Sequence, residues 1–192
     1  MAPDRQTTNR PALTRPLNFL LYQAGWFACV LGAARQRPWL GLTIGCALAA
    51  VHLVMTTQPR AQLRLMLLAA ALGVAVDSAL LAAGVFSFPS GMVVSWLPPP
   101  WLTVMWIQFA TTLHYSLSWL GARPVRLAVF GLVGAPLAFL AGEGLGGITI
   151  YPPKTVHLVM LGTLWFFALL ILGYAARRLM RGAAATDYRL SL

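Results

Sequence analysis

The longest apolar run in the chain reads LMLLAAALGVAVDSALLAAGVF and covers residues 65–86. A helix needs about 20 predominantly apolar residues to cross the hydrocarbon core of a bilayer. Lipid offers no hydrogen-bond partners to free backbone N–H and C=O groups, so a single run that crosses it must be helical. The run contains one charged side chain, Asp77. It therefore predicts a transmembrane helix with a carboxyl group within the bilayer.

Five further apolar runs surround it, separated by arginines or by segments rich in glycine and proline. They cover residues 17–34, 39–56, 101–120, 127–141 and 156–175. The run at 127–141 is the shortest, and Pro136 would kink a helix there because proline has no backbone N–H. We predict an all-α, polytopic transmembrane bundle of six helices over residues 17–175. Residues 1–16 form an arm before it, and residues 176–192 form a basic tail after it.

The first run has an alternative interpretation as a cleaved signal peptide. Arginines precede it, and the small residues Gly32, Ala33 and Ala34 end it, as in a cleavage region. The run is longer than a usual signal-peptide core and contains the polar Asn18 and Gln23. These features favour a retained helix, and cleavage would leave five.

The composition excludes an ordinary soluble domain. Hydrophobic residues make up 59% of the chain and charged residues 9%, whereas soluble domains have about 25% charged residues. The net charge of +10 would indicate nucleic acid in a soluble protein. Here the arginines lie at the ends of apolar runs, where they set topology and contact anionic headgroups. We expect membrane lipids and other inner-membrane proteins as partners, and no nucleic acid.

The distribution of basic residues predicts the orientation. With the N-terminus in the cytoplasm, Arg35, Arg37 and Lys154 would lie outside, and all other Lys and Arg residues would lie inside. Cytoplasmic loops carry the excess of Lys and Arg. We therefore predict that both termini are cytoplasmic and that the membrane is a bacterial inner membrane.

Small residues recur at four-residue spacing on three of the predicted helices. Such stripes let helix backbones approach closely in lipid. We expect packing within the chain at these positions, with homodimerisation as the alternative. The stripes are Gly41, Gly45 and Ala49; Ala71, Ala75, Ala79 and Ala83; and Gly131 and Ala135.

The run at 101–120 predicts a helix with a polar face and an apolar face. At 100° per residue, its polar side chains fall on one arc, and Trp106, Phe109 and Leu113 fall on the opposite one. We expect the polar arc to face inward, the apolar arc to face lipid, and Gln108 to meet Asp77 at the same depth. Ionisable groups within a bilayer are costly and mark functional sites. The predicted intramembrane cluster is Asp77, Gln108, Thr111, His114, Gln23, His52 and Asn18.

Two interpretations of this cluster stay open. The polar groups form interhelical hydrogen bonds, or they line a cavity that binds a headgroup, a small polar molecule or a proton. His52 and His114 share a depth on different helices, so a b-type haem with these axial ligands is a further hypothesis. Apart from that hypothesis we predict no cofactor, and we find no metal signature.

Glu143, Lys154 and His157 form a predicted outer group. They lie in or beside a segment rich in glycine and proline, which is typical of a solvated, turn-rich loop. The alternative is a rim site for a lipid headgroup.

The sequence resembles a bacterial inner-membrane family, domain of unknown function 2878. The resemblance rests on residues spread from Leu17 to Ala175. It implies a small multi-pass membrane protein with a lipid-associated or envelope role, and it assigns no catalytic residue. The matching residues are Asn18-Phe19, Gln23, Gly25-Trp26-Phe27, Asp77-Ser78, Pro100-Trp101, Trp106, Phe109-Ala110-Thr111-Thr112-Leu113, Gly134-Ala135-Pro136-Leu137 and Ala141-Gly142.

We therefore expect a non-enzymatic, accessory or lipid-associated protein with a polar intramembrane cavity. One alternative is a membrane-embedded enzyme that acts on acyl chains or headgroups, with His114 as acid or base and Asp77 tuning it. Another is a small proton-coupled transporter that uses Asp77. The sequence leaves the ligand and the oligomeric state open.

Overall fold

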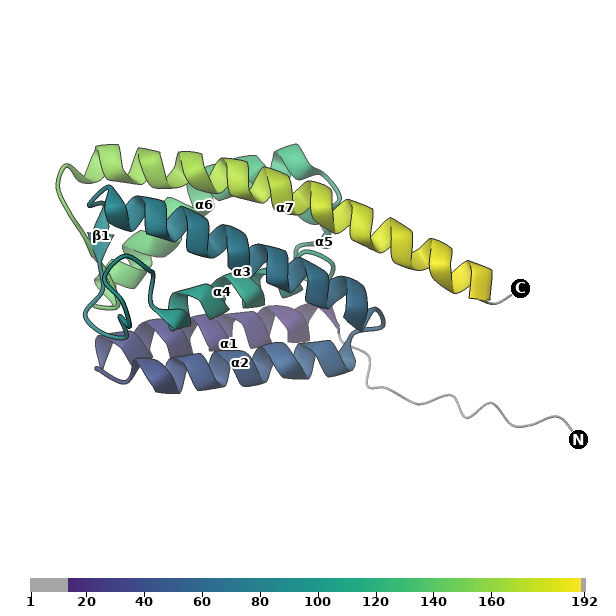
Figure 1. The fold of residues 1–192 in the computed structure, drawn as a ribbon. Coiled ribbons are helices and arrows are strands. Elements are labelled where there is room, and N and C mark those ends of the chain that lie inside the picture. The colour runs from purple at the N-terminus through teal and green to yellow at the C-terminus, as the bar shows by residue number, and fades with distance from the viewer. Residues whose placement is uncertain (1–13, 191–192) are drawn as a thin grey trace, which may run out of the picture.

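The computed structural model describes residues 14–190, with side chains as far as Leu179 (Figure 1). Almost all of the predicted N-terminal arm lies outside the described residues. Residues 176–190 of the predicted tail continue the last helix along its axis. That helix extends beyond the rest of the bundle in Figure 1.

Helices form nearly all of the regular structure in the described part of the chain. Five of them, α1, α2, α3, α6 and α7, are long and apolar enough to cross a membrane. The chain is therefore a helical membrane protein. The elements are α1 Arg15–Ala34, α2 Pro38–Met55, α3 Pro59–Ala82, β1 Phe86–Ser87, α4 Pro100–Thr112, α5 Ser118–Gly121, α6 Pro124–Gly144, β2 Thr149–Ile150 and α7 Lys154–Leu190.

Proline begins most of these helices. Pro16, Pro38, Pro59, Pro100 and Pro124 each occupy one of the first two helical positions, where the missing N–H costs nothing. This explains why α3 starts at Pro59, before the apolar run itself. The end of α3 is set by glycine conformation, since Gly84 has φ 70° and closes a glycine-capped turn.

The predicted helix at 101–120 is broken. Helix α4 has 13 residues, about 20 Å at 1.5 Å per residue, and α5 follows after a turn. Asn18 of α1 accepts hydrogen bonds from the backbone N–H and the hydroxyl of Ser116 within that turn. The break is stable because a side chain of another helix replaces the helical carbonyl as partner.

The bundle consists of two helical hairpins with α3 and α4 between them. Figure 1 shows α1 and α2 side by side, α6 and α7 side by side, and α3 and α4 in the middle, and the main packing contacts follow this order. Helix α4 packs against α1, α2 and α3. The expected lipid-facing arc is therefore wrong, because Trp106, Phe109 and Leu113 are buried by neighbouring helices.

Two of the three predicted small-residue stripes are buried between helices, and the third is exposed. Gly41, Gly45 and Ala49 are buried, and a Cβ built at Gly41 would lie 2.6 Å from the carbonyl oxygen of Ala28 in α1. Gly131 and Ala135 are buried too. For the α3 stripe, the expected packing within the chain is wrong, since all four of its alanines are exposed, and the alternative of homodimerisation stays a prediction. The interior face of α3 is instead Ala69, Gly73, Asp77 and Leu80.

Helix α6 continues through Pro136 and spans more residues than predicted. Proline leaves the carbonyl of Leu132, four residues earlier, without its helical partner. Gly162 of α7 packs at this point, and a Cβ there would lie 2.5 Å from the Leu132 oxygen. The close approach of α7 therefore shields the unpaired Leu132 carbonyl of α6.

The loops at one end of the bundle are tied together by a short sheet. Strands β1 and β2 pair antiparallel, with Phe86 opposite Ile150 and Ser87 opposite Thr149. Phe86 and Ile150 are almost fully buried in the apolar cluster beneath. The short sheet therefore forms a fixed cap over α3 and α6, and it corrects the predicted third helix, which had included Phe86.

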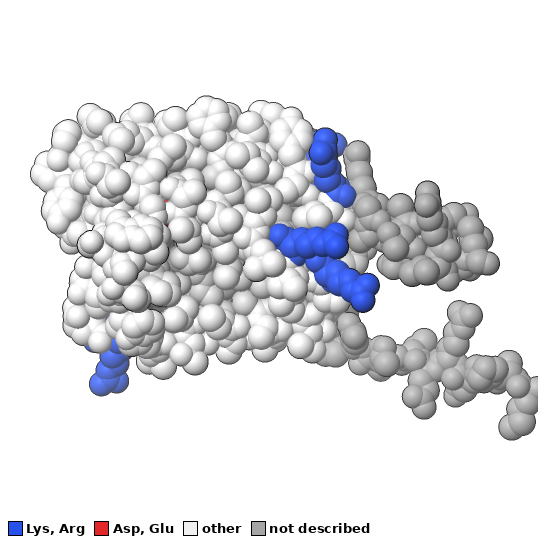
Figure 2. All heavy atoms as spheres, in the orientation of Figure 1, with Lys and Arg blue, Asp and Glu red and all other residues white. Residues whose placement is uncertain are grey.

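The charged residues lie at the ends of the bundle. On the face in Figure 2, Lys and Arg lie at the two ends, and the side between them is almost free of charged residues. Large apolar side chains are exposed along those sides, among them Leu20, Val54 and Val159. An apolar belt between charged ends is the surface that a bilayer covers.

Candidate functional site

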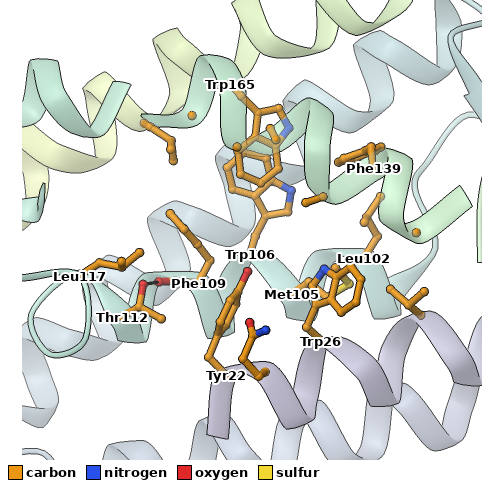
Figure 3. A pocket seen from close by; sticks show the side chains of 18 of the residues that line it. Tyr22, Trp26, Leu102, Met105, Trp106, Phe109, Thr112, Leu117, Phe139 and Trp165 are labelled. Atoms are coloured by element: carbon orange, nitrogen blue, oxygen red, sulfur yellow. Dashed lines mark hydrogen bonds between the residues drawn. The ribbon is translucent and has the colours of Figure 1, made fainter. Parts of the chain in front are cut away.

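A cavity of about 270 Å³ lies between α1, α4, α6 and α7. Aromatic rings from all four helices point toward it (Figure 3). Such a wall suits an apolar ligand with a few oriented polar groups. Its aromatic members are Phe19, Tyr22, Trp26, Trp101, Trp106, Phe109, Phe130, Phe139 and Trp165.

The cavity exists because α1 packs against α4 and α6 packs against α7, whereas α1 and α6 hardly touch each other. Most of the α6 residues that line the cavity are small, namely Gly131, Gly134, Ala135, Ala138 and Gly142. Glycine and alanine leave volume where larger side chains would fill it. The predicted packing stripe of Gly131 and Ala135 therefore both contacts α7 and lines this space.

The cavity opens on the side of the bundle. Two of its lining residues, Phe19 of α1 and Phe130 of α6, are 47% and 42% exposed. Both lie on helices that can cross a membrane. Their exposed sides therefore face hydrocarbon, and a molecule dissolved in the bilayer could enter without crossing a polar surface.

Two stacked indoles form the back wall. The rings of Trp106 and Trp165 lie 4.0 Å apart between centroids, at 25° to each other. The Trp106 Nε1 donates a 2.8 Å hydrogen bond to Oδ2 of Asp77. The Trp165 Nε1 is buried and has no hydrogen-bond partner among the described residues.

Asp77 is fully buried and does not line the cavity. Its second oxygen, Oδ1, has no partner in the described part of the chain. The expected contact with Gln108 does not form, because Gln108 points to the opposite side, against Gly25 and Gly45. Asp77 meets Trp106 instead, a residue that the helical arc had assigned to lipid.

Asn18 is the centre of a polar network between α1, α2 and the end of α4. Its Nδ2 lies 3.4 Å from Nδ1 of His52 and donates to the carbonyl of Thr111 at 3.3 Å. Its Oδ1 accepts the two bonds from Ser116. Three of the predicted residues are thus brought together, and Ser116 was missed because the prediction placed it within a continuous helix.

A second, much smaller cavity adjoins this network. Its volume is about 10 Å³, and Asn18, His52, Gln108 and Thr111 are among its lining residues. That is room for about one water molecule. Both amide atoms of Gln108 and Nε2 of His52 have no partner among the described residues. Four residues of the predicted polar cluster thus lie around this small cavity, and the larger cavity is mainly apolar.

His114 belongs to a separate contact. Its two ring nitrogens each lie 3.3 Å from a protein oxygen, Oε1 of Gln62 and the carbonyl of Ala176. Gln62 was missed because it precedes the apolar run, although it is buried in α3. Neither His114 nor His52 lines the larger cavity. The haem and acid–base hypotheses gain no support from this geometry, and an optical spectrum would test the first.

Gln23 is the one member of the predicted cluster that lines the larger cavity. Thr112 and Ser116 line it too, near the turn that follows α4. The polar side chains of the cavity thus come from α1 and from the end of α4.

Two members of the predicted outer group form an ion pair. Nζ of Lys154 donates to Oε2 of Glu143 at 2.8 Å, and Oε1 of Glu143 accepts from the backbone of Ile150 in β2. His157 lies beside them, with Nδ1 2.9 Å from the carbonyl of Tyr151. These contacts hold the capping loops together, and an exposed pair of this kind contributes about 0–1 kcal/mol.

Residues 15–171 match the family described as "Protein of unknown function (DUF2878)". The chain belongs to this family. This match confirms the resemblance to DUF2878 that the sequence showed. No curated protein and no solved structure matches the chain.

The DUF2878 match covers the whole candidate site. Every residue that lines the larger cavity, from Phe19 to Leu169, lies within residues 15–171. Ala176, which His114 contacts, lies beyond it. The aromatic cavity is therefore built entirely from the DUF2878 domain.

Proposed function

We propose that the chain crosses a bacterial inner membrane six times, with both termini in the cytoplasm. Helix α4 and the turn and α5 after it provide the fourth crossing, since this segment runs along the bundle between α3 and the hairpin of α1 and α2 (Figure 1). The basic residues support this orientation. One end carries Arg35, Arg37 and Lys154, and the opposite end carries Arg15, Arg60, Arg64, Arg123, Arg126, Arg177 and Arg178.

Cysteine labelling tests this topology. Ser95 and Thr57 are exposed loop residues at opposite ends of the bundle. In a chain with Cys29 and Cys46 replaced by alanine, Ser95→Cys should react with a membrane-impermeant maleimide in intact cells. Thr57→Cys should react only after the cells are opened. The reverse pattern would show that the orientation is inverted.

We also propose that the protein is an accessory, lipid-associated protein that binds one apolar molecule in the larger cavity. The observation that carries this proposal is an aromatic cavity of about 270 Å³ whose lining includes exposed phenylalanines of two membrane-length helices, Phe19 of α1 and Phe130 of α6. Burial of apolar surface in a shaped pocket adds dispersion contacts that fluid lipid tails do not provide. A membrane-dissolved molecule would therefore prefer the cavity to the bulk bilayer.

Filling the cavity tests this function. Gly134 lines it, and a Cβ there meets only the ring of Phe130, at ordinary contact distances of 3.5 Å and more. We expect Gly134→Leu to fold. It should reduce the amount of co-purified lipid, measured by native mass spectrometry, about tenfold, which corresponds to a loss of about 1.4 kcal/mol of binding free energy. Gly144→Leu, with open space in the same helix and outside the cavity, is the matched control. Equal lipid content in both variants would contradict the proposal.

A further inference from the structure

The aromatic cavity is lined by a tryptophan, Trp165, whose buried Nε1–H has no partner among the described residues. The indole N–H can only donate, and a buried donor left unpaired costs about 1–3 kcal/mol. An occupant with an acceptor oxygen at this depth would recover that free energy.

The direction of this N–H is fixed by packing. Trp106 stacks on the Trp165 ring, and Phe109 and Phe139 contact it at 77° and 76°, with centroids 6.2 Å and 6.3 Å away. Trp106 itself is held by its hydrogen bond to Asp77. The indole nitrogens of both tryptophans lie on the same side of the stack in Figure 3. Asp77 therefore holds the Trp106 ring on which Trp165 stacks, as a positioning residue.

Polar groups also line the α1 side. The Tyr22 hydroxyl points from α1 toward the indole pair (Figure 3), and the amide of Gln23 lines the same cavity. Polar groups thus lie on more than one side of an aromatic space. A saturated hydrocarbon chain has no acceptor oxygen for these polar groups. A phospholipid has acceptor oxygens in its esters, but they lie beside the headgroup and not within the hydrocarbon layer.

We propose that the occupant is an isoprenoid quinone, with one ring carbonyl accepting the hydrogen bond of Trp165 and the tail leaving between α1 and α6. This rests on the proposed lipid-binding function and names its ligand class. A planar ring packs well against aromatic walls, and its two carbonyls can meet polar groups on different sides of the cavity. A cavity of about 270 Å³ is at the small end for ligand sites, which suits a ring better than a whole phospholipid.

The test compares a benzoquinone that carries a ten-carbon chain with the corresponding decylbenzene, which lacks the carbonyls. Binding to purified protein in detergent is measured by calorimetry. The wild type should bind the quinone at least tenfold more tightly than decylbenzene. Trp165→Phe keeps a ring and removes the N–H, so quinone affinity should fall about tenfold, the worth of one hydrogen bond, while decylbenzene affinity changes little. Trp119→Phe, at a 62% exposed residue outside the cavity, should change neither affinity.

A second variant keeps the test decisive if Trp165→Phe lowers the melting temperature. Tyr22→Phe removes only a hydroxyl and should weaken quinone binding by about threefold to tenfold. Equal affinity of the wild type for quinone and decylbenzene, or tighter binding of decanoic acid than of quinone, would overturn the quinone assignment. If Gly134→Leu still removes bound lipid, that result leaves the proposed lipid-binding function standing. If Gly134→Leu changes nothing and no probe binds, the proposed function itself fails.

Discussion

Replacing Gly73 with leucine is expected to destabilise the bundle by roughly 3 kcal/mol or more, as severe overpacking does. A Cβ at Gly73 would lie 2.3 Å from Cγ and 2.4 Å from Cδ1 of Trp106. The indole cannot retreat, because Trp165 stacks on it and Asp77, one turn further along α3, accepts its hydrogen bond. The substitution should therefore separate α3 from α4 and open the back wall of the cavity.

The measurement is the free energy of unfolding in mixed micelles, together with the yield of folded protein. Ala75→Leu lies on the exposed face of the same helix and adds a similar volume, so it should change stability by less than about 0.5 kcal/mol. If Gly73→Leu were as stable as Ala75→Leu, Trp106 would not pack against α3. The hydrogen bond between Trp106 and Asp77 would then be wrong as well.

The helices that cross the membrane were predictable because bilayer thickness and backbone hydrogen bonding constrain them so strongly. The predicted runs reproduce α1 and α2 to within two residues at either end. Prolines mark the helix starts, and counting them as first-turn residues would have placed Pro59 and Gln62 within α3. That correction alone would have added Gln62, the partner of His114, to the candidate polar residues.

The broken fourth helix could not be predicted from periodicity. Residues 113–117 would continue α4 by composition, and the break depends on Asn18, far away in the sequence, satisfying Ser116. Which side chains of α4 are buried depends in the same way on the helices around it. A helical wheel assumes that one side meets lipid, whereas α4 contacts α1, α2 and α3.

The larger cavity could not be predicted from the sequence either. Small residues at 131, 134, 135, 138 and 142 are consistent both with tight packing and with an open space. Which of the two occurs depends on whether α1 packs against α6, and the structure keeps these two helices apart. Polarity guided the prediction to Asp77 and the histidines, but the larger space lies among aromatic rings that resemble ordinary core.

Gly25→Ala is expected to destabilise the protein by about 2–3 kcal/mol, a large effect for one methyl group. The added Cβ would lie 1.6 Å from Oε1 of Gln108. Surface glutamines would simply rotate away, but this amide is also against Gly45 of α2, where a Cβ would lie 2.7 Å from its Nε2. Gln108 is 2% exposed, and the cavity of about 10 Å³ beside it is too small to take the whole amide group.

A double-mutant cycle separates this clash from any other effect of the substitution. Gln108→Ala removes an amide that has no hydrogen-bond partner among the described residues, so its own cost should be small. In that background Gly25→Ala should cost almost nothing, which gives a coupling energy of about 2 kcal/mol between the two positions. Ala24→Leu, on the exposed face of α1, should leave the free energy of unfolding unchanged. If Gly25→Ala cost the same with and without Gln108, the amide would lie elsewhere, and the close packing of α1, α2 and α4 around it would be refuted.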